Sequence, residues 1–329
     1  MRVLVTGATG CVGANIVEAL LEQGHTVRAL QRSTSRLDAL AGLAPEMVVG
    51  DVLDHDSLLA ALAGCDWVFH AAAISQYWRN KAELIYRVNV EGTRNVLRAA
   101  LAQGVRRVIY TSSVGALGVP TRPDQRLDET ATFNLPPQRF PYGHSKVLAE
   151  EVVQQAVAEG LDAVIVNPVS VIGKRDVGFI GGEFLRAARQ GKALIAPPGG
   201  IGVVSARLTG VGHVLAAERG RAGERYILNG ENIAYRLLMD MVADVVGARR
   251  PLCTVPRPIM NLCAAPVDLW NNLHRKPPLV DGNQVRLSTH FMYFDGSKAE
   301  RELGFPQVPA SVAIKEAWDW YRAQGIMKK

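Results

Sequence analysis

The sequence predicts an α/β protein built on a doubly wound parallel sheet, with a smaller lobe formed mainly by the C-terminal part of the chain. Up to Gly173, short apolar runs rich in β-formers alternate with segments of helical period, and the connections between them are short. Such alternation is typical of βαβ units, whose parallel sheet is covered by helices on both faces. After Gly173 the alternation loosens and Gly and Pro cluster. We therefore expect a main domain over residues 1–173, joined by returning elements near 205–230, and a lobe over 174–329.

Each expected element of the main domain ends at a turn signal or at a change of period. Gly24, Gly64 and Gly160 follow three of the expected helices, as glycine does at many helix ends. The expected strands are Arg2–Val5, Thr26–Leu30, Met47–Val49, Trp67–His70, Val105–Thr111 and Ala163–Val166. The expected helices are Cys11–Gln23, Asp56–Ala63, Lys81–Ala102 and Tyr142–Ala158. Two segments, Val211–Glu218 and Ile227–Leu228, are expected to return to this domain.

The composition is that of a globular protein and excludes several classes. Of the 329 residues, 48% are hydrophobic and 21% charged, which is too apolar for a disordered chain. The 37 basic and 31 acidic residues give a net charge of +6, scattered along the chain, so we expect no nucleic-acid partner. No apolar run is long enough for a membrane-spanning helix, and the N-terminus does not look like a signal peptide.

The cysteines and histidines show no metal-ligand spacing. The four cysteines lie far apart, without a CxxC pair, at positions Cys11, Cys65, Cys253 and Cys263. A disulfide framework or a metal site is therefore not expected, and a reducing, cytoplasmic location fits best. The three histidines near the expected site are interpreted as structural side chains with satisfied hydrogen bonds: His70, His144 and His213.

A glycine-rich turn joins the first strand to the first helix. It reads Thr6-Gly7-Ala8-Thr9-Gly10-Cys11-Val12-Gly13. Glycines at this spacing allow a tight turn, close approach of backbone amides to a pyrophosphate, and close packing of helix on strand. In this strand–turn–helix context the motif predicts a Rossmann-type dinucleotide site rather than a chance glycine-rich loop. The residues expected to contact the cofactor here are Gly7, Thr9, Gly10, Cys11, Val12 and Gly13.

The end of the second strand bears on which dinucleotide binds. An Asp or Glu there would accept hydrogen bonds from the adenosine ribose, but the chain reads Ala29-Leu30-Gln31-Arg32-Ser33, with no carboxylate before Asp38. The guanidinium of Arg32 can hold a 2′-phosphate with two donors. We therefore expect NADP(H) to be favoured, with NAD(H) possible. In the alternative interpretation Arg32 is a solvated loop residue.

Tyr142 and Lys146 stand four residues apart at the start of an expected helix, so they share one face. A phenol is a poor base at neutral pH, and a nearby ammonium favours its phenolate form. Tyr142 could then exchange a proton with an alcohol or carbonyl oxygen while a hydride moves to or from nicotinamide. The polar end of the fifth strand, Thr111–Ser113, could supply a hydroxyl donor to the same oxygen. Alternatively, those residues form a polar strand end or a helix cap.

Several motifs together resemble one family. TGATGCVG, Gly50-Asp51-Val52, FHAAA at residues 69–73, NVEGT at 89–93, TSSVGALG, YGHSK and Asn167-Pro168 occur in the order seen in extended short-chain dehydrogenases/reductases, the NAD-dependent epimerase/dehydratase superfamily. Within these, the chain is similar to the dihydroflavonol-reductase-like and hopanoid-associated epimerase-like groups. The similarity is strong over residues 1–175 and weaker to the end, through 223–228 and 297–304.

The resemblance implies roles for particular residues. Ser113, Tyr142 and Lys146 would form the catalytic triad. Asn89 would support a helix kink or a water near Lys146. Further cofactor contacts are implied for Asp51 and Val52 at the adenine, for Ala71, Ala72 and Ala73 at the ribose and phosphates, and for Pro168 at the nicotinamide. The resemblance also implies a homodimer, in which 81–102 and 142–158 of each protomer form a four-helix bundle.

The function expected from these observations is NADP(H)-dependent reduction of a carbonyl, or oxidation of an alcohol, on a fairly apolar small molecule. The first alternative is a nucleotide-sugar epimerase or dehydratase with bound NAD. That alternative needs cations for a diphosphate in the lobe, where the candidates are Arg186, Arg189, Lys192 and Arg207. The stretch Val204–Thr209 lacks the acidic VHVDD-like pattern of many relatives, which disfavours sugar-nucleotide recognition. The second alternative is a non-catalytic NADP(H)-sensing module, which has no need of a Ser/Tyr/Lys set.

Two further segments are open to several interpretations. Val255–Leu273 is apolar and partly amphipathic: it could be a pocket wall, a membrane-touching element or, as we expect, a core helix of the lobe broken near Pro266. Tyr77–Arg79 could face the substrate or pack within the lobe.

Overall fold

A parallel sheet of seven strands forms the central layer in the part of the chain that the structure describes. The structure is a computed structural model describing residues 1–76, 80–273 and 281–327, so Tyr77–Arg79 lies outside the described residues. The strands, in chain order, are β1 (Arg2–Thr6), β2 (Thr26–Gln31), β3 (Glu46–Val49), β4 (Trp67–His70), β5 (Arg107–Thr111), β6 (Ala163–Pro168) and β10 (Arg225–Leu228). Their order across the sheet is β10-β6-β5-β4-β1-β2-β3, with every pair parallel. The predicted fold class, a Rossmann-type doubly wound sheet, is confirmed.

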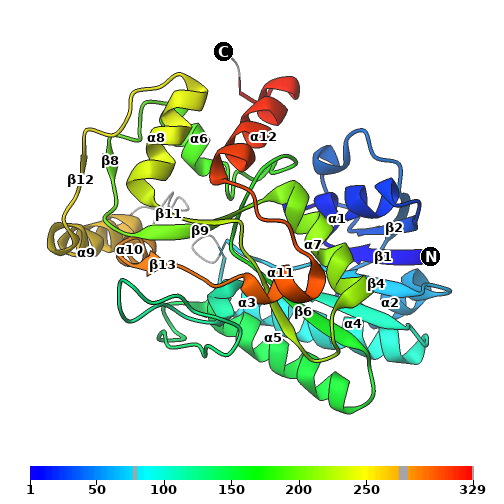
Figure 1. The fold of residues 1–329 in the computed structure, drawn as a ribbon. Helices are drawn as coiled ribbons and strands as arrows, with labels where there is room; N and C mark the ends of the chain where they lie inside the picture. Colours follow the sequence, from blue (N-terminus) through cyan, green and yellow to red (C-terminus); the bar gives the residue numbers. More distant parts are fainter. Residues whose placement is uncertain (77–79, 274–280, 328–329) are drawn as a thin grey trace.

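Helices cover both faces of this sheet (Figure 1). They are α1 (Cys11–Glu22), α2 (His55–Leu62), α3 (Ala82–Tyr86), α4 (Gly92–Ala102), α5 (Pro141–Ala158) and α7 (Ala206–Arg219), with short turns η1 (Asp38–Leu40) and η4 (Val114–Ala116). Alternate residues of a strand point to opposite faces, so Val3 and Val5 enter one hydrophobic cluster and Leu4 the other. The first cluster lies under α1 and α7, the second under α2, α4 and α5.

The strand order reverses between β1 and β4, and this reversal positions the site. In open parallel sheets, ligands bind beyond the carboxyl ends of the strands at such a switch point. The glycine loop follows β1, and Ala71 follows β4. Both therefore lie at the ligand-binding edge of the sheet.

The expected single helix over Lys81–Ala102 is wrong in detail. Residues 87–91 form a π-helical segment, η3 (Arg87–Glu91), between α3 and α4. Asn89 lies in it: its Oδ1 accepts from the Ile74 amide (2.8 Å), and its Nδ2 donates to the Ile74 carbonyl (3.1 Å) and to Ser145 Oγ (2.9 Å). A π-bulge turns one side chain out of the regular helical repeat, and here it turns Asn89 toward the loop after β4 and toward α5. The implied helix irregularity at Asn89 is thus present, and it separates two helices.

Two smaller sheets and several helices make up the rest. The strands are β7 (Ser170–Ile172), β9 (Gly200–Ser205), β11 (Glu231–Ala234) and β13 (Phe291–Met292) in one sheet, and β8 (Ile195–Ala196) and β12 (Cys253–Thr254) in the other. The helices are α6 (Glu183–Arg189), α8 (Tyr235–Val246), α9 (Arg257–Leu273), α10 (Gly282–Leu287), α11 (Ser297–Leu303) and α12 (Ala310–Ala323). A third hydrophobic cluster joins α6, α8 and α12 to β7 and β9.

The chain returns to the central layer after this lobe begins, since α7 packs on α1 and β10 pairs with β6. Both elements are longer than the segments expected from the sequence. We propose to keep the boundary at residue 173 and to count α7 and β10 with the first domain.

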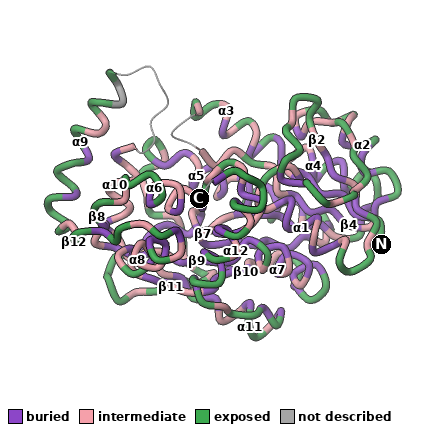
Figure 2. The backbone as a smooth tube through the Cα atoms, turned by 90° about the horizontal axis from the view of Figure 1, so that it is seen from above, coloured by how far each residue is buried: buried purple, intermediate pink, exposed green. Residues whose placement is uncertain are grey.

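The expectation of a core helix over Val255–Leu273 is wrong. Helix α9 continues through Pro266 and lies at the edge of the molecule, where Figure 2 shows it mostly exposed. Its large apolar side chains face outward: Leu262 is 76% exposed, whereas Ala264 is fully buried. Periodicity shows that a helix has an apolar face, but the face can also point away from the protein. Within the described residues no helix is long and apolar enough to cross a membrane.

Candidate active site

The three glycines of the first turn differ in whether packing requires them. Gly7 has φ +67°, and a Cβ there would lie 2.6 Å from the backbone carbon of Ala71. A Cβ on Gly13 would lie 2.1 Å from the Gly7 carbonyl oxygen, so close packing of α1 on the loop requires glycine there. A Cβ on Gly10 would meet only the Gly7 carbonyl oxygen, at 3.4 Å, and its φ of −94° suits any residue. Packing therefore explains Gly7 and Gly13, but it leaves open space over Gly10, as a bound pyrophosphate requires.

The N-terminus of α1 is suited to an anion. Gly10 is the N-cap and supplies no side-chain cap, and the first turn carries no acidic residue. The first amides of a helix have no intrahelical acceptor and add a partial positive charge. The Cys11 thiol is turned inward, where it donates to the Lys174 carbonyl (3.7 Å) and burial raises its pKa. Cys11 can therefore serve a ligand through its amide rather than its sulfur.

The loops after β3 and β4 lie at the same edge. Asp51 is partly buried, and its Oδ1 accepts from the Leu53 amide (2.9 Å). Val52 is buried against Gly92. The amide of Ala71 donates to the Thr6 carbonyl (3.2 Å), which holds this segment beside the glycine loop.

The remaining predicted cofactor residues fall at neighbouring positions. The amide of Ala72 donates to Thr6 Oγ1 (3.3 Å), and Ala73 is exposed. Pro168 is buried at the end of β6, and Thr9 is half-buried in the glycine loop. Arg32 follows β2 and is exposed; within the described part of the chain its guanidinium forms no ion pair. It is therefore available to a ligand at the end of β2.

The turn that follows Ser113 packs closely on the turn that carries Tyr142, and this contact depends on Gly143, which the sequence interpretation missed. Ser113 follows β5 and caps η4, where its Oγ accepts from the Gly115 amide (3.1 Å). A Cβ on Gly143 would lie 2.6 Å from the Gly115 carbonyl oxygen, and one on Gly115 would lie 3.7 Å from the Tyr142 ring. The close approach of η4 to the first turn of α5 therefore requires glycine at position 143, whereas a Cβ at position 115 would make only an ordinary van der Waals contact with the Tyr142 ring. Ser113 and Tyr142 thus lie on the two turns that meet there.

The protonation state of Tyr142 differs from the expectation based on spacing. Burial raises the pKa of the Tyr142 phenol, and the nearby Ser113 hydroxyl opposes that rise. The expected lowering by the Lys146 ammonium does not dominate. Tyr142 is therefore a neutral phenol at physiological pH, a state that can donate a proton.

Lys146 is buried beneath the site. Only 2% of its surface is exposed, and its Nζ donates to the Thr111 carbonyl (2.7 Å) and to the Tyr110 hydroxyl (3.3 Å). Burial lowers the pKa of Lys146 to about 7, while the nearby Glu150 acts to raise it. Its charge therefore titrates in the physiological range.

A buried carboxylate lies one helical turn beyond Lys146 on α5. Glu150 is 1% exposed; its Oε1 accepts from Ser112 Oγ and from Asn167 Nδ2 (2.8 Å), and its Oε2 pairs with Arg225 (2.7 Å). Asn167 Nδ2 also donates to the Ser113 carbonyl (3.1 Å). This network connects β5, β6, β10 and α5 directly beneath the predicted catalytic side chains. Sequence reasoning missed Glu150, although its spacing of four from Lys146 places it on the same helix face.

The three histidines have hydrogen-bond partners. His213 Nδ1 bonds the Thr209 carbonyl (2.7 Å), so this nitrogen carries the hydrogen and Nε2 accepts from Thr111 Oγ1 (2.9 Å). His70 bonds threonine hydroxyls on both sides, and His144 Nδ1 bonds the Tyr86 hydroxyl. Burial lowers the pKa of His70 to about 3 and that of His213 to about 4, so both are neutral.

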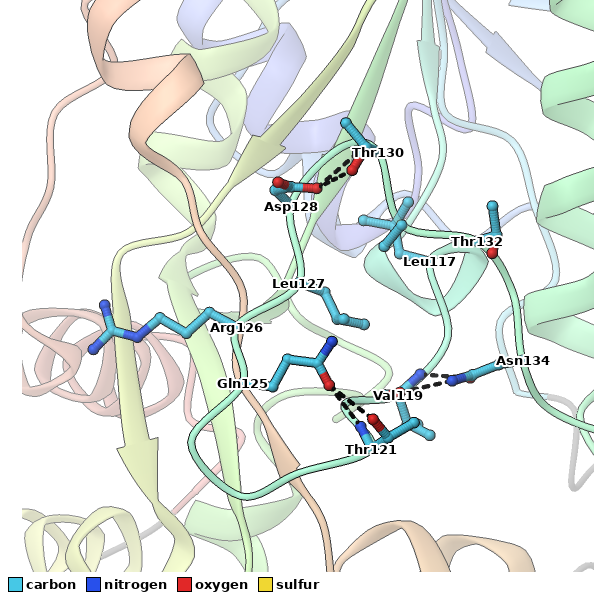
Figure 3. A pocket seen from close by; sticks show the side chains of 11 residues that line it. Leu117, Val119, Thr121, Gln125, Arg126, Leu127, Asp128, Thr130, Thr132 and Asn134 are labelled. Atoms are coloured by element: carbon cyan, nitrogen blue, oxygen red, sulfur yellow. Dashed lines mark hydrogen bonds between the residues drawn. The ribbon is translucent and has the colours of Figure 1, made fainter.

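A cavity of about 430 Å³ lies in the loop that follows η4 (Figure 3). Its lining begins at Leu117, four residues after Ser113, and ends at Asn134. Two sets of hydrogen bonds within the loop fix its shape. The Asn134 side chain bonds both the amide and the carbonyl of Val119 (2.9 Å each), and Gln125 Oε1 accepts from the Thr121 amide and hydroxyl. The lining of the cavity combines polar side chains with the apolar Leu117, Val119 and Leu127.

The cations considered for a sugar-nucleotide diphosphate lie in two places, with Arg207 in α7 apart from the three on or just after α6. Arg186 pairs with Glu183 on its own helix, α6. Arg207 pairs with Glu22 at the end of α1 (3.8 Å), so it lies against the first domain. The arrangement provides no ready diphosphate clamp from these two residues.

Comparisons with known proteins show the family. The model of the NAD dependent epimerase/dehydratase family matches residues 3–200. A Synechocystis sp. protein that carries the name dihydroflavonol 4-reductase is 40% identical, with 98% of this chain and 95% of the relative covered. Sterol demethylase protein B of Methylococcus capsulatus is 33% identical (99% and 100% covered). A 4-hydroxy-2-methyl-3-oxo-4-farnesyl-3,4-dihydroquinoline-1-oxide ketoreductase of Stigmatella aurantiaca is 31% identical (93% and 92% covered).

Solved structures share the whole fold. The crystal structure of gox2253 superposes with a TM-score of 0.87 at 36% identity, covering 99% of both chains. The dTDP-glucose 4,6-dehydratase DesIV of Streptomyces venezuelae, solved with NAD bound, gives a TM-score of 0.78 at 25% identity, covering 100% of this chain and 99% of that one.

The fold and these relatives together define an NAD(P)-dependent enzyme that acts on a small molecule. The chain belongs to the NAD dependent epimerase/dehydratase family, and its named relatives include reductases.

Proposed function

We propose that the protein is an NADP(H)-dependent carbonyl reductase, running as an alcohol dehydrogenase in reverse, on a fairly apolar small molecule. The observation that carries this proposal is the Tyr142 phenol, which burial keeps neutral in the first turn of α5, against the turn that follows Ser113 and one helical turn before the buried Lys146. A phenol held protonated suits the reductive direction, in which the carbonyl oxygen must receive a proton. The glycine loop and the N-terminus of α1 fit the pyrophosphate of the cofactor.

The roles follow from the geometry. A bound nicotinamide dinucleotide supplies the hydride. Ser113 donates a hydrogen bond to the substrate carbonyl oxygen and orients it, and Tyr142 gives that oxygen a proton as negative charge develops. Lys146, when charged, stabilises the phenolate left on Tyr142 and can hold the nicotinamide ribose. The network around Glu150 holds the segments carrying these groups in place.

The substrate class rests on two kinds of support. The relatives named for a sterol and for a farnesylated quinoline act, by their names, on large apolar molecules. In this chain, Arg186 and Arg207, two of the cations considered for a nucleotide diphosphate, pair with Glu183 and Glu22 instead. An apolar carbonyl compound therefore fits better than a nucleotide sugar. The exposed thiols of Cys253 and Cys263 suit a reducing cytoplasm, where we place the enzyme.

Substitution of Tyr142 tests the chemistry. Tyr142→Phe keeps the ring and removes the proton donor, so we expect turnover of a carbonyl panel with NADPH to fall by ~10² or more, with little change in cofactor affinity. Tyr235→Phe is the matched control, because Tyr235 is a buried tyrosine of α8 in the lobe. Near-normal turnover in Tyr142→Phe would rule out the assigned proton donor.

The cofactor preference rests on charge at the end of β2. A 2′-phosphate carries nearly two negative charges, and the exposed guanidinium of Arg32 can bind it with two donors, while Gln31 offers no repelling carboxylate. A charge-assisted contact of this kind contributes roughly 1.5–3 kcal/mol, or about ten- to a hundredfold in affinity.

Titration of both cofactors tests that preference. We expect NADPH to bind at least about tenfold tighter than NADH, Arg32→Ala to remove most of the difference, and Gln31→Asp to invert it. Arg36→Ala is the control, since Arg36 pairs with Asp38 in the same loop. Equal affinities in the unmodified protein, or an unchanged ratio in Arg32→Ala, would refute the assignment.

A further inference from the structure

Helix α9 presents an apolar stripe to the outside. Its outward side chains follow helical spacing and are largely exposed: Ile259 (54%), Leu262 (76%), Leu269 (62%), Trp270 (65%) and Leu273 (71%). Pro266 continues the stripe, and no charged residue interrupts it. Folded monomers seldom expose so many large apolar side chains in one row, and such rows mark interaction surfaces.

The opposite face of α9 is the one that holds the helix to the protein. Met260, Ala264 and Asp268 recur at intervals of four; the first two are buried. Asp268 accepts from the Gly282 amide (2.8 Å) and pairs with Arg286 of α10 (3.1 Å). The helix is therefore fixed in an orientation that turns its apolar stripe outward.

A second apolar group lies at the same end of the molecule, beside the short ladder of β8 and β12 (Figure 1). Leu194 is 57% exposed and Leu252 is 81% exposed, and the Leu252 amide donates to the Leu194 carbonyl (2.9 Å). β12 leads into α9 through Val255 and Pro256. The apolar surface thus extends from this ladder along the helix.

Positive charge accompanies this surface. Lys192, Arg249 and Arg257 are exposed and form no ion pair within the described residues. In the sequence, residues 249–276 contain five Lys or Arg and one Asp, against 37 and 31 in the whole chain. An apolar helical face with basic flanks is the pattern that lies in the interface of an anionic bilayer.

We infer that the α9 stripe, together with Leu194 and Leu252, docks the enzyme on an anionic lipid surface. The apolar side chains enter the boundary between headgroups and acyl chains, and the flanking cations contact acidic headgroups. A second copy of the chain fits this face less well, because a two-fold contact would bring the cationic flank against its own copy.

The docking face adjoins two cavities lined by the loop that follows η4. Arg257, the first residue of α9, lines a cavity of about 190 Å³ together with Thr121 and His290. Thr121 also lines the cavity of Figure 3, whose lining begins four residues after Ser113. A membrane-dissolved apolar carbonyl would reach the site by this side. This step rests on the proposed function, whereas the docking itself does not.

Flotation of the full-length protein with vesicles tests the docking. We expect it to float with phosphatidylcholine vesicles that contain phosphatidylglycerol and to float far less with phosphatidylcholine alone. The double variant Leu262→Glu/Leu269→Glu should lower partitioning by about tenfold or more, because both charges would enter the apolar boundary. Val312→Glu, at an exposed valine of α12, is the matched control and should float like the unmodified protein.

A vesicle-free assay separates this inference from the proposed function. Turnover of a water-soluble carbonyl with NADPH should be equal in the double variant and the unmodified protein, which also shows that the variant folds. Docking is refuted if the unmodified protein floats with neither vesicle, or if the double variant floats as well as it does. Loss of a dimer in the double variant would assign the stripe to a second copy and would equally overturn the inference. Absence of turnover in all proteins would refute the reductase proposal and leave the flotation result standing.

Discussion

The ammonium of Lys146 is a charge held where water does not reach it. Its two hydrogen-bond partners, the Thr111 carbonyl and the Tyr110 hydroxyl, are neutral, and only Glu150 favours the charged form through its field. Burial outweighs that field and lowers the pKa of Lys146 to about 7. The residue thus changes charge near neutral pH.

This titration predicts a pH dependence of reduction. Below about pH 7 Lys146 is charged and can stabilise the Tyr142 phenolate that proton transfer creates; as the pH rises through about 7 the charge is lost. We expect kcat/KM for carbonyl reduction to fall over that interval. In Lys146→Arg the guanidinium stays charged, so a slower enzyme with a flat profile is expected. Identical profiles in the two proteins would show that Lys146 does not set the pH dependence.

At this scale the sequence predicts residue positions better than residue states. The spacing of Tyr142 and Lys146 selects two members of the proposed triad, whereas Ser113 was chosen among the polar residues at the end of β5 by the family resemblance. Spacing carries no information about desolvation, and desolvation decides the protonation of both Tyr142 and Lys146. Glu150 was missed for the same reason, since a glutamate on a helix reads as a solvated residue until β10 brings Arg225 beside it.

At the scale of elements, the turn from β1 to α1 separates two demands on glycine. Gly13 is required by the packing of α1 against Gly7, whereas Gly10 touches nothing that excludes a side chain. The motif does not distinguish the three glycines, whereas the structure shows that packing requires Gly7 and Gly13 and leaves room for a side chain at Gly10.

Alanine substitutions at Gly13 and at Gly10 should therefore affect different properties, the first stability and the second cofactor binding. Gly13→Ala places a Cβ 2.1 Å from a backbone oxygen, so we expect the free energy of unfolding to fall by about 3 kcal/mol or more. Gly10→Ala should leave urea unfolding nearly unchanged but weaken NADPH binding by about tenfold or more, because the methyl group occupies the space over the helix N-terminus. Urea titration and cofactor titration of both variants measure the two effects. Unaltered NADPH affinity in Gly10→Ala would contradict the placement of the pyrophosphate.

Helices and strands with a clear hydrophobic period were predicted correctly, but the direction in which a helix turns its apolar face was not. The strands of the central sheet are confirmed, with β5 beginning at Arg107 rather than Val105 because the Val105 amide still bonds the Ala100 carbonyl of α4. The outward apolar face of α9 was missed, and at Asn89 the resemblance implied a helix kink or a water but not a π-helical segment. Both depend on tertiary partners: Asn89 bonds Ile74 and Ser145, and α9 is turned by the attachment of Asp268 to α10.

At the scale of the whole molecule, helix α5 packs beside the continuous helical segment α3–η3–α4. Together these elements form one layer of the protomer, the outer slab. The Tyr86 hydroxyl bonds His144 Nδ1 (3.0 Å), and Asn89 Nδ2 bonds Ser145 Oγ (2.9 Å), so α3 and η3 are tied to α5 at both positions. Because these bonds already exist in the protomer, joining two slabs requires little further ordering. Because α5 belongs to the slab, Tyr142 and Lys146 lie on one of its helices.

The last prediction is a homodimer through this slab. The outer positions of α4 and α5 combine an exposed Leu101 (38%) with Arg98 on one helix and Glu151 on the other, all exposed. A two-fold contact uses the same patch twice, so Arg98 of each protomer can face Glu151 of its partner, with Leu101 near the centre of a four-helix bundle. We expect sedimentation equilibrium at micromolar protein to show a dimer that weakens with added salt, since exposed ion pairs are screened. Leu101→Glu should give monomers, because it brings a carboxylate close to its own copy, whereas Leu262→Glu on α9 should leave the dimer intact. A monomer in the unmodified protein would refute the dimer. A dimer that is lost in Leu262→Glu and kept in Leu101→Glu would show that the interface does not lie on α4 and α5.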